Sequence, residues 1–424
     1  MEHLIIQGGN KLFGEVDISG MKNSALPIIF ACILIEEECI IENIPRVSDV
    51  ENALEILRQM GAKAYFVEKN TVLINTNSIS ENICGFDLIS KMRASSYLMG
   101  AMLGRFKNAY LPMPGGCNFG FRPIDQHLKG FKTLGAEFTI EDCFVSVSAP
   151  NGLLAQKITL DKISVGATIN MMLASVLLNG ITVIQNVAKE PHVDDVIIFL
   201  NKCGAKIKRF KNSIICEGVA KLHGVKYRIF PDMIEALTYA SFLGITKGEL
   251  LLKKIDYSHL KTCLDVFEKM GYRIKPFKDC LKIGINQVPM GVSIVTAPYP
   301  GFPTDLHPQL AALLCFSNNG GEIRDEVFPT RFKYVDELRK MGAVIQQIDN
   351  MVSIESAKLH GAHTDATDLR AGAALVAAAL GCCEESRINN INYIVRGYEG
   401  LVDKLSSIGG KIKLIKGETN NGSN

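Results

Sequence analysis

The sequence predicts an α/β fold of two domains, each made of three repeated units around buried inner helices, with a cleft between the domains. Three observations lead to this prediction: a pattern that occurs six times, six helical segments that are apolar on all sides, and a length of 424 residues. At roughly 100–200 residues per domain, such a length corresponds to two or three domains. Six repeats divide evenly into two domains of three.

The repeated pattern is an amphipathic helix, then a glycine, then a short strand. Two examples are LEILRQMGAKAYF, which ends at Phe66, and VDELRKMGAVIQQI, which ends at Ile348. The shared glycines are Gly61, Gly135, Gly204, Gly271, Gly342 and Gly409, spaced by 74, 69, 67, 71 and 67 residues. A helix that ends in a left-handed cap favours glycine, which has no Cβ atom to clash there. The alternating residues that follow predict a half-buried strand.

Each repeat also contains a second helix that is nearly all apolar and rich in small residues. These helices begin near NSALPIIFACIL, RASSYLMGAMLG, SVGATINMMLAS, DMIEALTYASFL, DLHPQLAALLCF and DLRAGAALVAAA. A helix that is apolar all round must be buried on every side. We therefore expect these helices in the middle of each domain and the sheets outside them.

Polar residues gather at the N-terminal ends of the inner helices. They are Lys22 and Asn23, Arg93, Lys162 and Ser164, Asp232 and Glu235, Asp305, and Asp368 and Arg370. A helix N-terminus attracts anions, because it carries roughly half a positive charge and free N–H groups. Parallel inner helices in two facing domains would therefore enclose an anion-attracting cleft, although the net charge of the chain is only +2.

Composition excludes several classes of function. With 46 basic and 44 acidic residues and no tryptophan, the chain has neither a global positive field nor a basic stripe with interleaved aromatics, so we expect no nucleic-acid partner. The N-terminus lacks the features of a signal peptide, and no apolar run is long enough to cross a bilayer. We therefore expect a cytoplasmic protein with no membrane partner. We also expect it to be a monomer.

The cysteines and histidines predict neither a disulfide framework nor a metal site. Twelve cysteines are scattered without a C-x-x-C pair, and eight histidines show no metal-ligand spacing. We expect reduced thiols, no metal and no cofactor. Cys117 differs from the rest because it lies in the Gly-rich loop PGGCNFGFRPIDQH together with Arg122. A reactive thiol with a lowered pKa and a cysteine without a role are both open interpretations of this loop.

Two further residues have a functional and a structural interpretation. Lys22 precedes an inner helix, where a cation is unfavourable unless an anion shares the site. Asp305 follows the proline-rich segment APYPGFPT and precedes another inner helix. It could be an ordinary helix cap. It could also be the single carboxylate among cations, which would suit a general base.

Taken together, the motifs resemble the enolpyruvyl transferases, and among them those that act on UDP-N-acetylglucosamine. ISGMKNSALP, KMRAS, LPMPGGCNFGFRPIDQH, SVGAT, TAPYPGFPTD, FPTRF, ATDLRA and RGYE occur in the family's order over essentially the whole chain. The resemblance implies two inside-out α/β domains joined by a double crossover. Residues 1–20 with 231–424 would form the catalytic-side domain, and residues 21–230 would form the domain that carries the Cys117 loop.

The resemblance also implies an activity: transfer of the enolpyruvyl group of phosphoenolpyruvate to the 3-hydroxyl of UDP-N-acetylglucosamine, with release of phosphate, as the first committed step of peptidoglycan synthesis. It assigns catalysis to Cys117, Asp305 and Lys22, with Cys117 as general acid and as the thiol that fosfomycin alkylates, and Asp305 as base. It assigns phosphoenolpyruvate binding to Lys22, Asn23, Arg122, Arg370 and Arg396. It assigns UDP-N-acetylglucosamine binding to Arg93, Arg122, Pro123, Ile124, Asp125, Gln126, Lys162, Ile163, Ser164, Val165, Asp305 and Val327.

The chain departs from the family's usual motifs at three positions. Met233 replaces an arginine in PDRIE, Val395 replaces the aspartate of DRGYE, and Gly372 replaces the serine of ATDLRAS. The catalytic set is complete, which argues against a homologue that has lost activity and only binds nucleotide sugars. The other enzyme alternative is a shikimate-using enolpyruvyl transferase, and the Cys117 loop argues against it.

Overall fold

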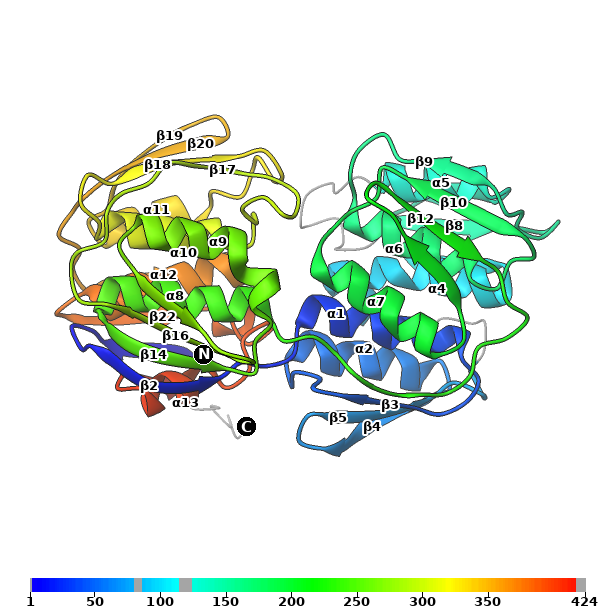
Figure 1. Cartoon of the computed structure of the whole chain (residues 1–424), viewed down its shortest axis with the longest axis horizontal. Helices are drawn as coiled ribbons and strands as arrows, with labels where there is room; N and C mark the ends of the chain where they lie inside the picture. Colours follow the sequence, from blue (N-terminus) through cyan, green and yellow to red (C-terminus); the bar gives the residue numbers. More distant parts are fainter. Residues whose placement is uncertain (1, 80–85, 114–123, 417–424) are drawn as a thin grey trace, which may run out of the picture. The chain divides into compact units, whose positions relative to one another are not determined.

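A computed structural model describes residues 2–79, 86–113 and 124–416 of the chain. The chain folds into two compact domains. Domain 1 comprises Met1–Ser19 and Pro231–Asn424, and domain 2 comprises Gly20–Phe230. The polypeptide therefore passes from one domain to the other twice. In Figure 1, domain 1 contains the blue N-terminal strands as well as the yellow-to-red C-terminal part of the chain.

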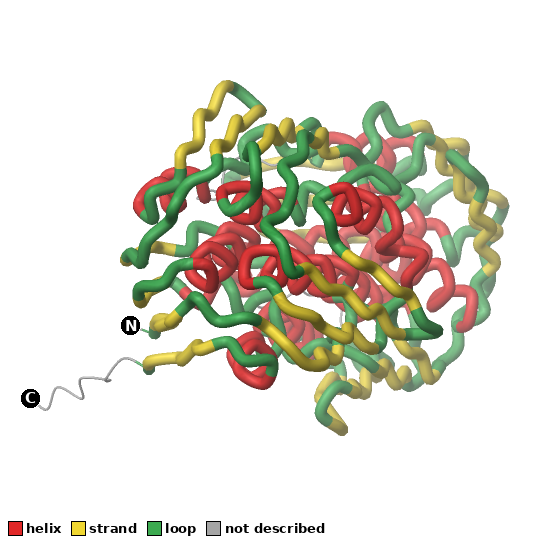
Figure 2. Tube along the Cα trace, turned by 60° about the vertical axis from the view of Figure 1, so that its left-hand side comes forward, coloured by secondary structure: helices red, strands yellow, loops and turns green. Residues whose placement is uncertain are grey.

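The inner helices lie where the sequence pattern predicts them, which confirms the fold class. Domain 1 contains α8 (Met233–Thr246), α10 (His307–Cys315) and α12 (Leu369–Gly381). Domain 2 contains α1 (Lys22–Ala31), α4 (Tyr97–Phe106) and α6 (Val165–Ser175). Every residue of α8 and α10 is buried. In Figure 2, which draws helices red and strands yellow, many of the helices lie between strands at the top and strands at the bottom of the view.

The outer helices are amphipathic and end at the shared glycines. They are α2 (Ser48–Gln59), α5 (Asp125–Thr133), α7 (Pro191–Lys202), α9 (Tyr257–Lys269), α11 (Tyr334–Lys340) and α13 (Leu401–Ser407). All six glycines have φ between 92° and 101°, the left-handed region that favours glycine. The predicted left-handed caps are therefore confirmed.

The sheets of domain 1 each combine antiparallel strands with one parallel edge strand, and β1 and β2 come from the N-terminus. The first runs β21 (His363–Asp365), β22 (Glu385–Asn389), β1 (His3–Gln7), β23 (Lys411–Ile415). The second runs β15 (Arg273–Pro276), β16 (Cys280–Ile285), β14 (Gly248–Lys253), β2 (Leu12–Asp17). The third runs β17 (Ile294–Thr296), β18 (Gly321–Asp325), β20 (Met351–Glu355), β19 (Val344–Ile348).

Domain 2 repeats this arrangement in two of its sheets, whereas the described strands of its third sheet are all antiparallel. One sheet runs β11 (Lys206–Arg209), β12 (Ser213–Glu217), β10 (Ile181–Gln185), β9 (Lys157–Thr159). Another runs β13 (Lys226–Arg228), β3 (Cys39–Glu42), β5 (Thr71–Asn75), β4 (Lys63–Glu68). The third runs β6 (Asn108–Pro112), β8 (Phe144–Ser148), β7 (Glu137–Glu141). The short helices η1 (Cys32–Leu34), α3 (Phe86–Lys91) and η2 (Arg93–Ser96) complete the domain.

Small residues allow the inner helices to approach each other closely. The backbone N–H of Gly100 in α4 donates to Oδ1 of Asn170 in α6 at 2.7 Å. A Cβ atom on Gly100 would lie 2.5 Å from the carbonyl oxygen of Asn170, so no larger residue fits there without moving a helix. Within the described residues, no helix has both the length and the hydrophobicity needed to cross a membrane.

Candidate active site

In domain 1, Asp305 lies between two arginines. Its Oδ1 accepts from Nη1 of Arg331 at 2.5 Å, and its Oδ2 accepts from Nη2 of Arg370 at 3.0 Å. Helix α10 begins two residues later with Leu306 as its N-cap and no side-chain cap. The carboxylate of Asp305 therefore faces cations and does not cap its helix, which excludes the interpretation of this residue as a helix cap.

The two arginines control the protonation of Asp305. Burial alone would raise the pKa of this carboxyl, but the charges of Arg370 and Arg331 and their hydrogen bonds outweigh burial and hold the pKa well below its usual range. Asp305 is therefore ionised at neutral pH. A carboxylate held in this way is a weak base as long as both guanidinium groups remain in contact with it.

A second carboxylate, Asp325, organises the segments on either side of Asp305. It is fully buried and accepts from the hydroxyls of Thr296 and Thr304 at 2.5 and 2.6 Å. It also accepts from the backbone N–H groups of Val327 and Phe328, both at 2.9 Å. Asp325 thereby fixes the turn that carries Val327, a predicted sugar contact, next to the segment that carries Asp305.

In domain 2, Lys22 is the first residue of α1 and pairs with Asp49 of α2 at 3.0 Å. The exposed fractions of the two side chains are 11% and 6%. A lysine at a helix N-terminus is repelled by the helix dipole, and the carboxylate of Asp49 offsets this repulsion. Asn23 follows in the same turn and is partly exposed. Both residues are therefore presented at the start of an inner helix, as predicted.

Gln126 connects two of the predicted nucleotide-sugar segments. Its Oε1 accepts from the backbone N–H of Asp161 at 2.7 Å, and its Nε2 donates to Oδ2 of Asp125 at 2.8 Å. The segment that follows Asp161 contains Lys162, Ile163, Ser164 and Val165, and leads into α6. Ser164 caps α6 by accepting from the N–H of Ala167 at 3.2 Å. The structure therefore brings residues 124–126 and 161–165 together.

Arg93 is exposed at the start of η2, close enough to influence the charge of His127 in α5. His127 is 7% exposed, and neither of its ring nitrogens has a hydrogen-bond partner among the described residues. Burial first, and then the charge of Arg93, lower the pKa of His127 to about 4. His127 is therefore neutral at physiological pH.

Part of the predicted site lies outside the described residues: Cys117, Arg122 and Pro123. Arg396 follows η4 (Ile391–Tyr393) and is partly exposed. The expectation of reduced thiols needs one correction among the described cysteines, because Cys143 is disulfide-bonded. Nine others are free, and seven of those nine are buried.

Comparisons with known proteins agree with this geometry. The family model for EPSP synthase (3-phosphoshikimate 1-carboxyvinyltransferase) matches residues 6–405. UDP-N-acetylglucosamine 1-carboxyvinyltransferase of Halothermothrix orenii is 43% identical over 417 residues, which cover 98% of this chain and 100% of the relative. UDP-N-acetylglucosamine 1-carboxyvinyltransferase 2 of Clostridium acetobutylicum is 43% identical over 419 residues, which cover 98% and 100%. The chain belongs to the EPSP synthase family.

Solved structures show the same fold. The enolpyruvyl transferase NikO from Streptomyces tendae superposes with a TM-score of 0.89 at 25% identity, covering 97% of this chain and 98% of NikO. EPSP synthase from Acinetobacter baumannii gives a TM-score of 0.75 at 17% identity, with 98% and 100% coverage, and this likeness concerns the fold alone. The inside-out arrangement expected from the motifs is therefore confirmed for this member of the family.

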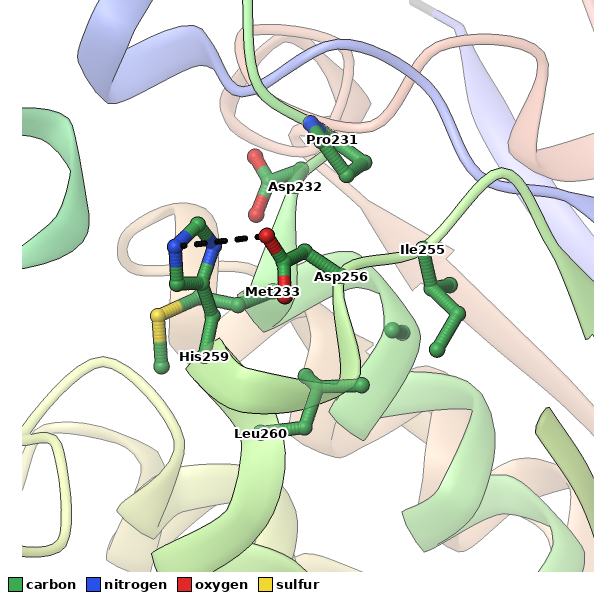
Figure 3. A pocket seen from close by; sticks show the side chains of 8 residues that line it. Pro231, Asp232, Met233, Ile255, Asp256, His259 and Leu260 are labelled. Atoms are coloured by element: carbon green, nitrogen blue, oxygen red, sulfur yellow. Dashed lines mark ion pairs between the residues drawn. The ribbon is translucent and has the colours of Figure 1, made fainter. Parts of the chain in front are cut away.

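The structure shows what surrounds Met233 and Gly372, two positions at which the chain departs from the usual motifs of the family. Met233 begins α8 and is 8% exposed. Because methionine is neutral, this position contributes no charge. It lines a small pocket together with Asp232 and the ion pair between His259 and Asp256 (Figure 3). Gly372 lies against Ile394: a Cβ atom there would come within 2.5 Å of Cγ1 of this isoleucine. Gly372 therefore leaves room for the side chain of Ile394, the residue before Val395.

Sequence reasoning missed Arg331 and Tyr398 as members of the site. Both belong to motifs of the sequence, FPTRF and RGYE, but only the folded structure shows what they contact. Arg331 reaches Asp305, and the hydroxyl of Tyr398 accepts from Arg370.

Proposed function

We propose that the protein transfers the enolpyruvyl group of phosphoenolpyruvate to the 3-hydroxyl of UDP-N-acetylglucosamine and releases phosphate. The observation that carries the proposal is the carboxylate of Asp305 between Arg331 and Arg370, in a chain 43% identical to relatives that bear the name of this activity. A carboxylate next to cations can accept a proton beside an anionic substrate. The reaction would be the first committed step of peptidoglycan synthesis.

The proposed roles of the residues follow the motifs. Cys117 protonates the methylene carbon of phosphoenolpyruvate, and Asp305 takes the proton of the sugar 3-hydroxyl. The phosphoenolpyruvate site comprises Lys22, Asn23, Arg122, Arg370 and Arg396. The nucleotide-sugar site comprises Arg93, residues 122–126, residues 162–165, Asp305 and Val327. These residues come from both domains.

The steps balance as an addition followed by an elimination. Protonation of the methylene carbon makes the enol carbon cation-like, and the sugar oxygen bonds to it while its proton passes to Asp305. The resulting tetrahedral intermediate returns a proton from the new methyl group to Cys117 and expels inorganic phosphate, which restores the double bond. The proton held by Asp305 leaves with the phosphate. Cations around the carboxylate and the phosphate stabilise the charge that develops.

Because Asp305 is paired with arginines, its strength as a base depends on whether the substrate is bound. Arg370 is proposed to bind phosphoenolpyruvate, and in the described geometry its guanidinium is bonded to Asp305. An anionic substrate competes with Asp305 for that cation. When it takes over the guanidinium, the pKa of Asp305 rises, and the carboxylate becomes a better base as the substrate arrives.

The proposal is tested by measuring phosphate release from phosphoenolpyruvate with purified full-length protein. We expect release with UDP-N-acetylglucosamine, and a product whose mass has increased by one enolpyruvyl group in place of a hydrogen. Release with shikimate 3-phosphate instead would overturn the proposal in favour of the activity after which the family model is named. Absence of release with either acceptor would contradict both enzyme functions.

A further inference from the structure

The hydroxyl of Tyr398 contacts one residue from each of the three inner helices of domain 1. One of these residues is Arg370, the arginine that holds Asp305. It accepts from Nη1 of Arg370 in α12 at 3.1 Å and from Nε2 of Gln309 in α10 at 3.0 Å. It lies 3.0 Å from Oγ1 of Thr238 in α8. Nothing in the motif assignments gives Tyr398 a role, although it lies within RGYE, two residues after Arg396.

One consistent set of donors and acceptors accounts for these bonds. The hydroxyl of Thr238 donates to the carbonyl of Ile234 at 2.7 Å, and its oxygen accepts from Nε2 of Gln309 at 3.1 Å and, in this arrangement, from Tyr398. The O–H of Tyr398 therefore points to Thr238, and both of its lone pairs face N–H donors, one from Gln309 and one from Arg370. Burial raises the pKa of Tyr398, so the phenol keeps the proton that this arrangement requires.

The phenol also restricts Arg370 through its ring. The guanidinium carbon of Arg370 lies 5.5 Å from the centre of the Tyr398 ring. Tyr398 and Arg370 are 3% and 5% exposed, so water cannot readily replace the hydroxyl as an acceptor. One edge of the guanidinium is thus fixed by Tyr398, while Nη2 on the other side reaches Oδ2 of Asp305 at 3.0 Å.

We propose that Tyr398 is a positioning residue for the reaction: its hydroxyl fixes Arg370 at the place from which it controls Asp305 and receives the anionic substrate. The inference rests on the proposed function for its catalytic consequence, but its geometric part stands without substrate. Tyr398 acts through Arg370 and does not itself contact Asp305 through any described hydrogen bond.

Several charged groups face Arg370 and Asp305, and a test of Tyr398 has to leave them in place. Asp305 faces Arg370 from α12 and Arg331 from the loop before α11. Arg370 in turn is influenced by Asp305 and by Asp232 at the start of α8. Removing the hydroxyl of Tyr398 leaves all of these charges in place and changes only how firmly Arg370 is held against Asp305.

The test compares the wild-type protein with Tyr398→Phe and with a matched control, Tyr272→Phe. Tyr272 is also a buried tyrosine of domain 1, and its hydroxyl donates to the carbonyl of Ala240 in α8 at 3.0 Å, but it does not contact Arg370. The carboxyl of Asp305 is titrated without substrate by carbon NMR of aspartate-labelled protein, with Asp305→Asn identifying its signal. We expect Tyr398→Phe to raise the pKa of Asp305 and Tyr272→Phe to leave it unchanged.

Kinetics supply the second readout. We expect Tyr398→Phe to lower kcat by about tenfold, the effect of one charge-assisted hydrogen bond, with little change in the KM for UDP-N-acetylglucosamine. An unchanged pKa of Asp305 in a folded Tyr398→Phe protein, or an equal rise in Tyr272→Phe, would overturn the positioning role. A wild-type protein without phosphate release would instead count against the proposed function, and the titration would still decide the inference.

Discussion

The guanidinium of Arg370 and the carboxylate of Asp305 meet at 3.0 Å although 65 positions separate them in the chain. Arg370 is the second residue of α12, and Asp305 lies two residues before α10. Each inner helix therefore delivers one partner of the ion pair. Because Arg370 is 5% exposed, the pair links the stability of domain 1 to the chemistry proposed for Asp305.

Asp305→Asn tests the proposed base. Turnover should fall by about 100-fold or more, because asparagine cannot accept the proton of the sugar hydroxyl. If Asp305 were an ordinary helix cap, asparagine would replace it at almost no cost in stability. The structure alters that expectation: the variant leaves buried Arg370 with a neutral partner, which should cost about 1–3 kcal/mol. Turnover and urea unfolding would be measured on the same preparation, well below the melting temperature.

Asp256→Asn is the matched control for that substitution, since Asp256 caps α9 and pairs with His259 rather than with the arginines. It should retain turnover. Normal turnover in Asp305→Asn would show that the base is another group.

Fosfomycin should alkylate Cys117 alone. This thiol lies in the loop that also carries Arg122, and a nearby cation favours the thiolate that attacks the drug. Among the described cysteines Cys383 is exposed, which makes it the natural internal control. Peptide mass spectrometry should place the fosfomycin adduct on Cys117, while iodoacetamide should also modify Cys383. A fosfomycin adduct on Cys383, or none on Cys117, would contradict the assignment.

Gln126→Met should weaken the nucleotide-sugar site without affecting phosphoenolpyruvate. The substitution removes the acceptor that holds the N–H of Asp161, so the segment 161–165 keeps only the exposed Lys129–Asp161 ion pair as its link to α5. Loss of one such bond corresponds to about a tenfold rise in the KM for UDP-N-acetylglucosamine. Lys129→Met is the matched control, because Lys129 contacts the same Asp161 only through an exposed ion pair. Equal effects of the two variants would show that Gln126 has no special role.

His127 should make domain 2 sensitive to acid. Its pKa is lowered from 6.5 to about 4, so the unfolded chain binds a proton at a pH where the folded protein does not. Its contribution to stability is complete above pH 6.5, decreases as the pH falls, and is lost by about pH 4, in total about 3 kcal/mol. Urea unfolding of wild type and His127→Gln, followed by circular dichroism, should show that the wild type loses more free energy of unfolding than the variant between pH 7 and pH 4.5. Parallel pH profiles would exclude this role.

The fold could be predicted because its signals are local and repeated. The left-handed glycines and the apolar inner helices each follow from a few neighbouring residues, and six occurrences leave little ambiguity. The site was predictable where a motif places a residue at a helix start, as with Lys22 and Ser164.

What the sequence could not predict depends on contacts between distant segments. Arg331 pairs with Asp305 across 26 positions, and no local pattern indicates which way a loop arginine points. The role of Tyr398 follows from three helices that converge on one hydroxyl. Helix capping by Asp305, an open interpretation in the sequence, is excluded only because both of its oxygens are bonded to guanidinium groups.

The pairing of β1 has a consequence for synthesis on the ribosome. This strand is translated long before its partners β22 and β23, although Leu4 lies opposite Ile388 and Leu414 in the folded domain. Domain 2 is a continuous stretch and can fold while domain 1 is still being translated. Throughout that interval the nascent chain carries an apolar strand with unpaired edges, which is a template for aggregation. The order of translation therefore leaves β1 without its partners until the end of domain 1 has been synthesised.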